Sequence, residues 1–319
     1  MHYRSLGVDG PSASALCLGA MTFGTTVDEE TATAILDRFT EAGGTFVDTS
    51  NNYAFWADGA DGFESEELLG RWIARRGNRE ELVLATKLGA RPVPGLPFPE
   101  HMEGLSARAV REAAEGSLRR LGTDRLDLYY AHVTDPATPV EETMGAFAAL
   151  VADGKATALG CSNHSAAELD EANRLAAERG WPGYRCIQQR HSYLRPRPGA
   201  DFGIQKHADE ALLSHLAQRP ELTLLAYSPL LGGSYCRPDR PLREEYAWPE
   251  AKARLAVLAE VAEESGATVN QVVLAWLLGH PVPTVPVVGA SSVAQLEESL
   301  GALDLVLDEE QRRRLDDAA

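Results

Sequence analysis

The sequence predicts an α/β protein that forms one domain over residues 1–319, a (β/α)8 barrel of the TIM type. Short β-rich runs alternate with helical patterns along the chain, and eight such runs occur without a clear break. Most of these runs lack polar/apolar alternation, which is typical of parallel strands covered by helices. The chain has 319 residues, 44% of them hydrophobic, so it can bury a large core.

Eight segments are predicted to be strands because each is short and rich in apolar residues. In chain order they are Ala15–Leu18, Thr45–Asp48, Leu82–Lys87, Leu126–His132, Ala156–Cys161, Cys186–Gln189, Thr223–Tyr227 and Thr284–Val288. Strands that alternate with helices form βα units, and eight units in succession favour a closed barrel.

Helices are predicted between the strands from apolar faces and from terminal residues. Glu29–Ala42 ends at a pair of glycines, and Ser106–Leu121 opens with Ser106 as N-cap and stops at Gly122. The other predicted helices are Glu64–Arg75, Glu141–Asp153, Ser165–Arg179, Glu210–Gln218, Glu250–Glu264, Thr268–Leu278 and Val293–Leu300.

Long loops are expected after strands three, six and seven. They contain Arg91–His101, Leu194–His207 and Leu231–Trp248, and they emerge at the carboxyl ends of the strands. Long loops at that end of a barrel usually line a substrate or cofactor site. A plain surface insertion is an equal alternative for the first loop, whereas a functional role is favoured for the third.

Composition and charge exclude several classes of protein. The net charge of −17 and the pI of about 4.9 argue against a nucleic-acid partner. The four cysteines form no CxxC pair, and three lie in apolar runs, which suits reduced, buried thiols. Neither a signal-peptide core nor a membrane-spanning stretch is found, so we expect no membrane partner and a cytoplasmic location.

Four polar residues stand at or just past the ends of three successive predicted strands. Asp48, Lys87 and His132 each close a strand, and Tyr53 follows Asp48 by five residues. The carboxyl ends of barrel strands form one rim, and active sites are built on that rim. We therefore expect these four side chains to converge.

The four residue types indicate proton transfer to an oxygen that gains negative charge. The ordinary pKa of a tyrosine is about 10, and a nearby ammonium such as that of Lys87 is expected to lower it. Asp48 would keep Lys87 charged and oriented, and His132 would hydrogen-bond a carbonyl oxygen. The set holds no evident nucleophile and no metal-binding cluster, so delivery of hydride needs a cofactor.

A series of short motifs resembles the aldo-keto reductases over essentially the whole chain. The matching segments are Gly19–Gly24, Phe46–Tyr53, Glu64–Glu66 with Leu69-Gly70, Ala85–Lys87, Asp127–His132, Gly160–His164, Ala226–Leu230 and Val288–Ser292. Each motif alone is weak, but all of them in order, at the ends of predicted strands, form a specific pattern.

The resemblance implies the reduction of an aldehyde or ketone by NADPH or NADH. It assigns Tyr53 as the proton donor, Lys87 as the residue that tunes its pKa, Asp48 as the partner of Lys87, and His132 as the group that orients the carbonyl. The alternative that stays open is a nicotinamide-binding regulatory subunit, like the β-subunits of potassium channels. An Asp48–Lys87 pair with a purely structural role is the plain alternative for those two residues.

The same resemblance implies a dinucleotide site along the rim. Its residues are Met21, Thr22, Asp48, Ser162, Asn163, Gln188, Tyr227, Ser228, Leu230, Gly289, Ser291, Gln295, Glu298 and Ser299, with Tyr227 stacked on the nicotinamide. The segment Gly289–Ser299 departs from the family because it has no basic residue for a 2′-phosphate. NADPH remains the first choice, NADH is a rival, and Arg237 or Arg240 is a candidate to reach the phosphate from the long loop.

The substrate is expected to be a small-molecule carbonyl compound, such as an aldehyde, a ketone, a keto-sugar or a biosynthetic intermediate. Phe55, Trp56 and Phe63 are candidates for an apolar substrate wall, and His191 is a candidate substrate contact. Four loop arginines would suit a larger, anionic ketone; they are Arg195, Arg197, Arg237 and Arg240. No oligomeric state is predicted.

Overall fold

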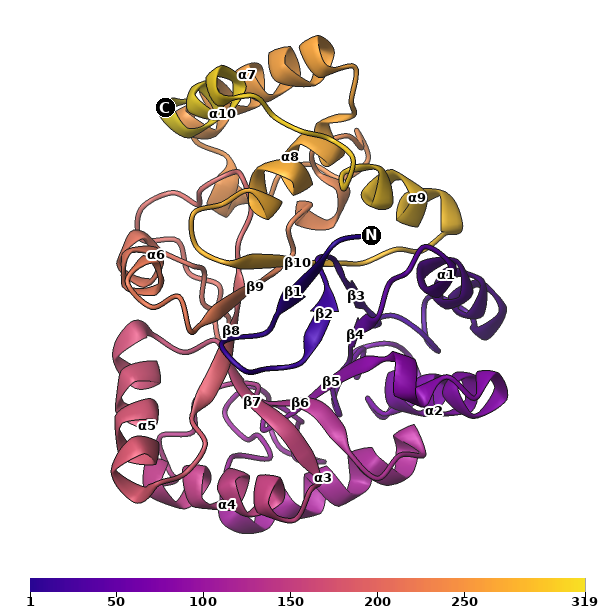
Figure 1. The fold of residues 1–319 in the computed structure, drawn as a ribbon, viewed down its shortest axis with the longest axis vertical. Helices are drawn as coiled ribbons and strands as arrows, with labels where there is room; N and C mark the ends of the chain where they lie inside the picture. Colours follow the sequence, from indigo (N-terminus) through magenta and orange to yellow (C-terminus); the bar gives the residue numbers. More distant parts are fainter. Residues whose placement is uncertain (319) are drawn as a thin grey trace.

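The computed structural model describes residues 1–318, and a closed parallel barrel occupies its centre (Figure 1). Its strands are β3 (Cys17–Gly19), β4 (Phe46–Asp48), β5 (Val83–Leu88), β6 (Leu126–Ala131), β7 (Ala156–Ser162), β8 (Tyr184–Arg190), β9 (Thr223–Tyr227) and β10 (Thr284–Val288). Each strand pairs with the next in the chain, and β10 closes the barrel against β3 through Val287 opposite Cys17. The prediction of an α/β barrel of the (β/α)8 type is confirmed.

Helices surround the barrel in the order expected for βα units (Figure 1). They are α1 (Glu29–Glu41), α2 (Glu64–Arg76), α3 (Ala107–Leu121), α4 (Val140–Ala152), α5 (Ala166–Arg179), α6 (Glu210–Ala217), α7 (Pro249–Ser265), α8 (Val269–Leu278), α9 (Val293–Gly301) and α10 (Glu309–Asp317). Short 3-10 turns occur at η1 (Arg79–Glu81), η2 (Leu231–Gly233) and η3 (Glu244–Tyr246). The last helix, α10, packs beside α7 at one end of the molecule.

The ends of α3 show why its boundaries could be predicted from the sequence. The Ser106 hydroxyl accepts a hydrogen bond from the Ala109 amide at 3.2 Å, which satisfies one of the free donors of the first turn. Gly122 follows the helix in the left-handed conformation, with φ of 64°, where a side chain would be strained. Predicted and observed ends of the other predicted helices differ by no more than one residue.

A short hairpin at the amino end of the barrel was not predicted. It pairs β1 (Tyr3–Ser5) with β2 (Ser12–Ser14), and Figure 1 shows it across the barrel opening. Leu6 and Ala13 of the hairpin are fully buried and pack with inward-facing barrel residues such as Phe46. The hairpin thus closes the amino end with apolar side chains.

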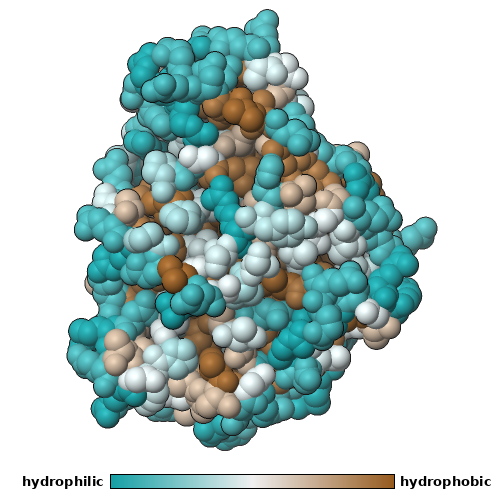
Figure 2. Space-filling view, viewed as in Figure 1, coloured by the Kyte–Doolittle hydropathy of each residue, from teal (hydrophilic) through white to brown (hydrophobic). Residues whose placement is uncertain are grey.

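Buried apolar side chains form two clusters. One cluster fills the barrel, and a larger cluster lies between the strands and the helices, where Trp72 is fully buried. Figure 2 shows hydrophobic residues gathered near the C-terminal helices on the face that carries the hairpin. Val306, on the chain after α9, is 86% exposed and lines a cleft of about 220 Å³ together with residues of α8 and of the N-terminal segment. Within residues 1–318, no helix combines the length and apolar character needed to cross a membrane.

Candidate active site

The four predicted catalytic residues converge at the carboxyl ends of neighbouring strands. Asp48 is the last residue of β4, Lys87 lies near the end of β5, and His132 directly follows β6. In the parallel pairing of β4 with β5, Asp48 lies opposite Ala85, two residues before Lys87. The pairing therefore brings the carboxylate and the amine to the same end of the barrel. Tyr53 reaches them from the loop that follows β4.

The Lys87 ammonium is the centre of the cluster, and all three of its hydrogens are used. Its Nζ donates to Asp48 Oδ1 at 2.5 Å, to Tyr53 Oη at 2.5 Å and to the Thr49 carbonyl at 2.7 Å. Tyr53 Oη in turn donates to Asp48 Oδ1 at 2.9 Å, and Asp48 Oδ2 accepts from Gln188 Nε2 at 3.0 Å. The side chains of Asp48 and Lys87 are 0% exposed, so their mutual attraction is little screened by water.

Burial controls the protonation of this cluster. It lowers the pKa of Lys87, an effect that the Asp48 carboxylate opposes. Burial, followed by the charge of Asp48, raises the pKa of Tyr53 well above its ordinary value. The expected lowering of the Tyr53 pKa is therefore not the net effect, because the phenol is desolvated and also donates to the carboxylate, and these two effects outweigh the nearby ammonium of Lys87. At neutral pH the phenol keeps its proton, which is the state that a proton donor needs.

His132 borders the phenol of Tyr53. The two ring centroids are 6.2 Å apart and the rings meet edge to face at 78°. The Nδ1 atom of His132 lies 3.2 Å from Ser50 Oγ. Burial and the nearby Lys87 charge lower the pKa of His132 to about 3, so the imidazole is neutral at neutral pH.

A buried polar chain connects the tetrad to three further strands. Ser162, at the end of β7, donates to the Gln188 carbonyl at 2.7 Å, and Gln188 donates to Asp48. Asn163 accepts from the Tyr227 hydroxyl at 2.9 Å. The structure thus brings together the residues that the family resemblance links to the nicotinamide end of a cofactor.

Strained backbone occurs at the same rim. Asn163, Ser228 and Leu231 have left-handed φ values of 59°, 53° and 49°, although none is a glycine. Such conformations are costly and tend to occur at functional sites. They shape the ends of β7 and β9, where the loops leave the barrel.

The residues linked to the adenosine end of a cofactor lie on the loop after β10 and on α9. Gly289 is exposed, and an added Cβ there would meet no atom within 4 Å, so the surface beside it is open. Ser291 donates to Gln295 Oε1 at 3.0 Å, and Glu298 accepts from Asn270 at 3.1 Å. Ser299 is buried, and its hydroxyl donates to the Gln295 carbonyl at 3.1 Å, so its hydroxyl is engaged within the helix.

The remaining predicted cofactor-binding residues lie at the carboxyl end of the barrel. Met21, after β3, is 44% exposed, whereas Thr22 and Leu230 are partly buried. Two arginines are relevant to whether the protein could bind the 2′-phosphate of NADPH. Arg38 of α1 forms an ion pair with Glu297 of α9, and Arg237 pairs with Asp239 at 2.5 Å.

The candidate substrate walls differ in their placement. Phe55 packs against Trp56 and against Phe98 of the loop after β5, with ring centroids 5.3 Å and 4.9 Å away. Trp56 is 60% exposed, so this aromatic group lies open at the surface. Phe63 instead lies between two arginines, with guanidinium carbons about 4 Å from its ring; these are Arg91 and Arg120.

The candidate substrate contacts, His191 and the loop arginines, interact with neighbouring side chains of the protein. His191 is buried against Trp276 and His280, at centroid distances of 5.9 Å and 5.7 Å. Arg195 and Arg197 lie 3.7 Å from Glu210 and Glu244, respectively. The sequence pattern gave no sign of these partners.

Two buried polar residues near His132 were not predicted as site residues. Ser50 contacts His132, and Ser50 Oγ also lies 2.7 Å from Asn52 Oδ1. They belong to the motif between Asp48 and Tyr53, but a motif does not show where a side chain turns. The contact of Ser50 with His132, and that of Asn52 with Ser50, follow only from the fold.

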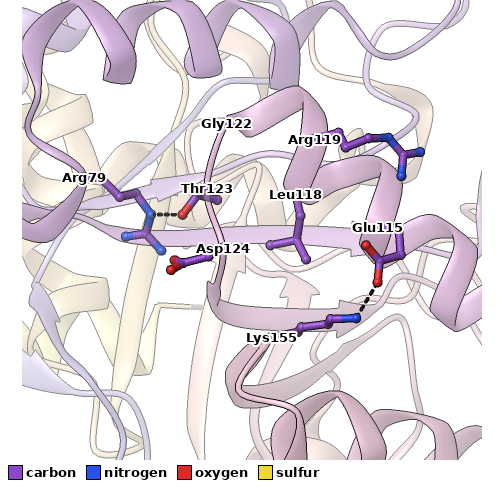
Figure 3. A pocket seen from close by; sticks show the side chains of 8 residues that line it. All are labelled: Arg79, Glu115, Leu118, Arg119, Gly122, Thr123, Asp124 and Lys155. Carbon is purple, nitrogen blue, oxygen red and sulfur yellow. Dashed lines mark hydrogen bonds and ion pairs between the residues drawn. The ribbon is translucent and has the colours of Figure 1, made fainter.

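A cleft of about 780 Å³ lies at the opposite end of the barrel (Figure 3). Its lining residues come from α3 and from the segments that precede β5, β6 and β7; they are Arg79, Glu115, Leu118, Arg119, Gly122, Thr123, Asp124 and Lys155. Figure 3 shows the Arg79–Thr123 and Lys155–Glu115 contacts within it. The cleft is separate from the rim that carries the tetrad, at an end of the barrel associated with stability. Over residues 1–318, no group of three or more His, Cys, Asp or Glu side chains is placed to hold a metal ion.

Comparison with known proteins agrees with this geometry. The model of the aldo/keto reductase family matches residues 15–319. The chain is 34% identical to an uncharacterized oxidoreductase of Bacillus subtilis, over 99% of this chain and 95% of that protein. It is 36% identical to a norsolorinic acid reductase of Emericella nidulans, over 97% and 79% of the two chains. It is 29% identical to a Schizosaccharomyces pombe aldo-keto reductase named for NADP(+), over 96% and 88%.

Proposed function

Because this chain belongs to the aldo/keto reductase family of oxidoreductases, we propose that it reduces an aldehyde or ketone to the alcohol with a nicotinamide dinucleotide. The observation that carries the proposal is the position of the Tyr53 hydroxyl. It is held between Lys87 Nζ and Asp48 Oδ1, at 2.5 Å and 2.9 Å, on the carboxyl rim of the barrel. A protonated phenol beside an ammonium can act as a proton donor, because the ammonium stabilises the phenolate that remains.

The reaction adds a hydride to the carbonyl carbon and a proton to the carbonyl oxygen. The reduced cofactor supplies the hydride when it is bound. Tyr53 gives its proton to the oxygen, and the charge left on the phenolate is stabilised by the Lys87 ammonium beside it. Asp48 keeps that ammonium charged and in place, and His132 positions the substrate at the same rim.

The residues along the rim suit a dinucleotide that extends from Tyr227 to α9. In this proposal Tyr227 stacks on the nicotinamide, and the carboxamide contacts Ser162, Asn163 and Gln188. Met21, Thr22, Ser228 and Leu230 border the middle of the cofactor, and Gly289, Ser291, Gln295, Glu298 and Ser299 form its adenosine end. The left-handed backbone at Ser228 and the open surface beside Gly289 support this path. The N-terminus of α9 is favourable for a phosphate.

We propose NADPH as the cofactor, with NADH as the alternative. The relative named for NADP(+) supports the first. The Arg38–Glu297 pair supports NADH, because a basic group beside α9 is already paired with a carboxylate.

We also propose that residues 1–319 act as one domain. We further propose that the protein is cytoplasmic, as the free, buried thiols of Cys17, Cys161 and Cys186 suggest.

The test is the oxidation of NADPH and NADH in the presence of aldehydes and ketones, with wild type and Tyr53→Phe. We expect turnover with at least one carbonyl compound and a loss of about 10²- to 10⁴-fold in the variant, because the proton donor is gone. Cofactor affinity should persist. Tyr3→Phe is the matched control, since Tyr3 lies on the exposed hairpin and donates only to the Gly43 carbonyl.

Equal turnover by wild type and Tyr53→Phe would contradict the proposal. A wild-type protein that binds the cofactor tightly but reduces no carbonyl compound would instead favour a regulatory subunit.

A further inference from the structure

The carboxylate of Glu103 joins the two chain segments that leave the barrel after β4 and β5. Its Oε1 and Oε2 accept from Asn51 Nδ2 at 3.1 Å and 2.9 Å, and Oε2 also accepts from the Gly89 amide at 2.8 Å. Asn51 lies two residues before Tyr53, and Gly89 lies two residues after Lys87. These contacts, here called the Glu103 bridge, therefore tie the segment that carries the phenol to the strand that carries the ammonium.

The segment that carries Tyr53 is paired with β5 only as far as Asn51. The Asn51 amide donates to the Lys87 carbonyl at 3.2 Å, which continues the pairing of β4 with β5. The chain then turns, and Ala54 has a left-handed φ of 57°. In the part of the chain that the structure describes, Asn51 is the last residue before Tyr53 whose amide makes this pairing. The Glu103 bridge thus acts on the residue from which the turn to Tyr53 begins.

Glu103 is itself fixed by the main chain of the loop that follows β5. Its amide donates to the Arg91 carbonyl at 2.8 Å, and the Gly104 amide donates to the Gly89 carbonyl at 3.1 Å. The two arms of this loop are therefore paired with each other where the loop leaves and rejoins the barrel. Because its backbone is held in this way, the Glu103 carboxylate is a fixed point to which Asn51 is bound.

The bridge requires an acceptor at Glu103 and a donor at Asn51. Both carboxylate oxygens receive N–H groups, so Glu103 only accepts. Burial raises its pKa, and the hydrogen bonds from Asn51 and Gly89 and the charges of Arg91 and Arg120 oppose that rise. Asn51 is 1% exposed, so loss of the carboxylate would leave its buried amide hydrogens without a partner.

We propose that Glu103 is a positioning residue for the reaction, which fixes the Tyr53 phenol relative to Lys87 through its bonds to Asn51 and Gly89. This inference rests on the proposed carbonyl reduction and adds a residue to that site. Glu103 acts through these neighbours, because its own hydrogen bonds go to Asn51 and Gly89. The plain alternative is that the bridge only stabilises the loop after β5. The two differ in whether Tyr53 moves when the bridge is broken.

The first test breaks the bridge with Asn51→Asp, which sets a second carboxylate against that of Glu103. Two carboxylates in contact cannot both ionise without a large cost, so at neutral pH they should move apart. We expect kcat to fall by about 10- to 10²-fold, because a small misplacement of a reacting group is costly. Relative to wild type, the loss should become smaller as the pH falls and the two groups share a proton.

The second test rebuilds the bridge with its groups exchanged, by adding Glu103→Gln to Asn51→Asp. The new amide nitrogen donates to the new carboxylate, and the new amide oxygen accepts from Gly89. We expect kcat to rise about tenfold over Asn51→Asp, a coupling typical of residues in contact. The matched control adds Glu142→Gln instead. Glu142 of α4 also accepts from a main-chain amide, that of Ala107 at 2.8 Å, and its change should restore nothing.

The position of Tyr53 is also measured without turnover, by NMR on protein with carbon-labelled tyrosine. The Tyr53 signal, assigned by its loss in Tyr53→Phe, should shift in Asn51→Asp and return in the exchanged double variant. A folded Asn51→Asp protein with the Tyr53 signal and kcat of wild type would overturn the inference, and the bridge would serve the loop alone. A double variant that restores neither would overturn it as well.

The same measurements separate this inference from the proposed function. If wild type reduces no carbonyl compound, the proposed function fails, and the Tyr53 signal still decides whether Glu103 positions the phenol. If Asn51→Asp does not fold, Glu103→Ala removes the bridge without adding a charge, while Asn52 still donates to the Ala90 carbonyl at 2.9 Å. An unshifted Tyr53 signal in Glu103→Ala would then overturn the inference.

Discussion

The two ends of the barrel are built differently. At the carboxyl rim, Asp48 and Lys87 lie in the interior with 0% exposure. At the amino end, the interior is closed by Leu6 and Ala13, and the charged pair Arg79–Asp127 keeps 12% and 11% exposure. Burying a charge pair costs desolvation energy that the attraction often does not recover. This contrast supports the proposal that the rim arrangement serves chemistry, while the apolar amino end serves stability.

Backbone conformation follows the same division. Ala54 and Asn163 of the rim have φ values of 57° and 59° and are almost fully buried. The hairpin has Asp9 at 64°, but this residue is exposed in a turn, where Asp is tolerated. Strain inside a packed site has to be held by its surroundings, so it marks the rim as the region under functional constraint.

Breaking the ion pair at each end should have the largest effect and should separate stability from activity. Lys87→Met leaves the buried Asp48 without its cation, so we expect a loss of about 3–5 kcal/mol in unfolding free energy. Turnover should fall by at least about 10²-fold, because the phenol loses its partner. Arg79→Met at the amino end should cost stability and leave kcat unchanged. Urea unfolding and steady-state kinetics on both variants measure these effects. A similar loss of kcat in Arg79→Met would show that the amino end, like the rim, is needed for activity.

The apolar closure of the amino end predicts a stability effect alone. Leu6→Ala should lower the unfolding free energy by about 2–5 kcal/mol, since Leu6 is fully buried among the barrel residues. Its kcat/KM should remain that of wild type. Val8→Ala is the control, because Val8 in the same hairpin is 49% exposed. A drop in kcat/KM of folded Leu6→Ala would show that the two ends are coupled.

The pH dependence of His132 should give the smallest effect at neutral pH, because the imidazole is mostly neutral there in both the folded and the unfolded chain. Its folded pKa of about 3 lies below the ordinary 6.5, so the unfolded chain binds the proton between these values and the folded chain does not. Stability should therefore decrease as pH falls from 6.5 towards 3, and this slope should be shallower in His132→Gln. Chemical unfolding across that range measures it. An unchanged slope in the variant would show that His132 titrates normally.

Much of the fold was predictable because strands and helices alternate with clear ends. The hairpin was missed because its strands, Tyr3–Ser5 and Ser12–Ser14, are only three residues long and show little apolar pattern. Helix α10 was missed because it is highly charged and buries only Leu315 among its described residues. Its signal was the capping pair Asp308 and Gln311, which satisfy each other's backbone donors.

The site was predictable to the level of residue position but not of side-chain contact. Strand ends place Asp48, Lys87 and His132 on one rim, as the sequence indicates. The pKa of Tyr53 was predicted in the wrong direction because its burial, and its hydrogen bond to Asp48, depend on packing. The Ser50 contact to His132 joins residues 82 positions apart, so only the folded chain shows it.

The most direct measurement is on the double variant Asp48→Asn with Lys87→Met, which removes the buried charge without leaving an unpaired ion. We expect an unfolding free energy equal to or above that of wild type, because neutral groups avoid the desolvation cost. We also expect that carbonyl reduction remains lost. A double variant that is strongly destabilised yet still active would show that the pair serves the fold and not the reaction.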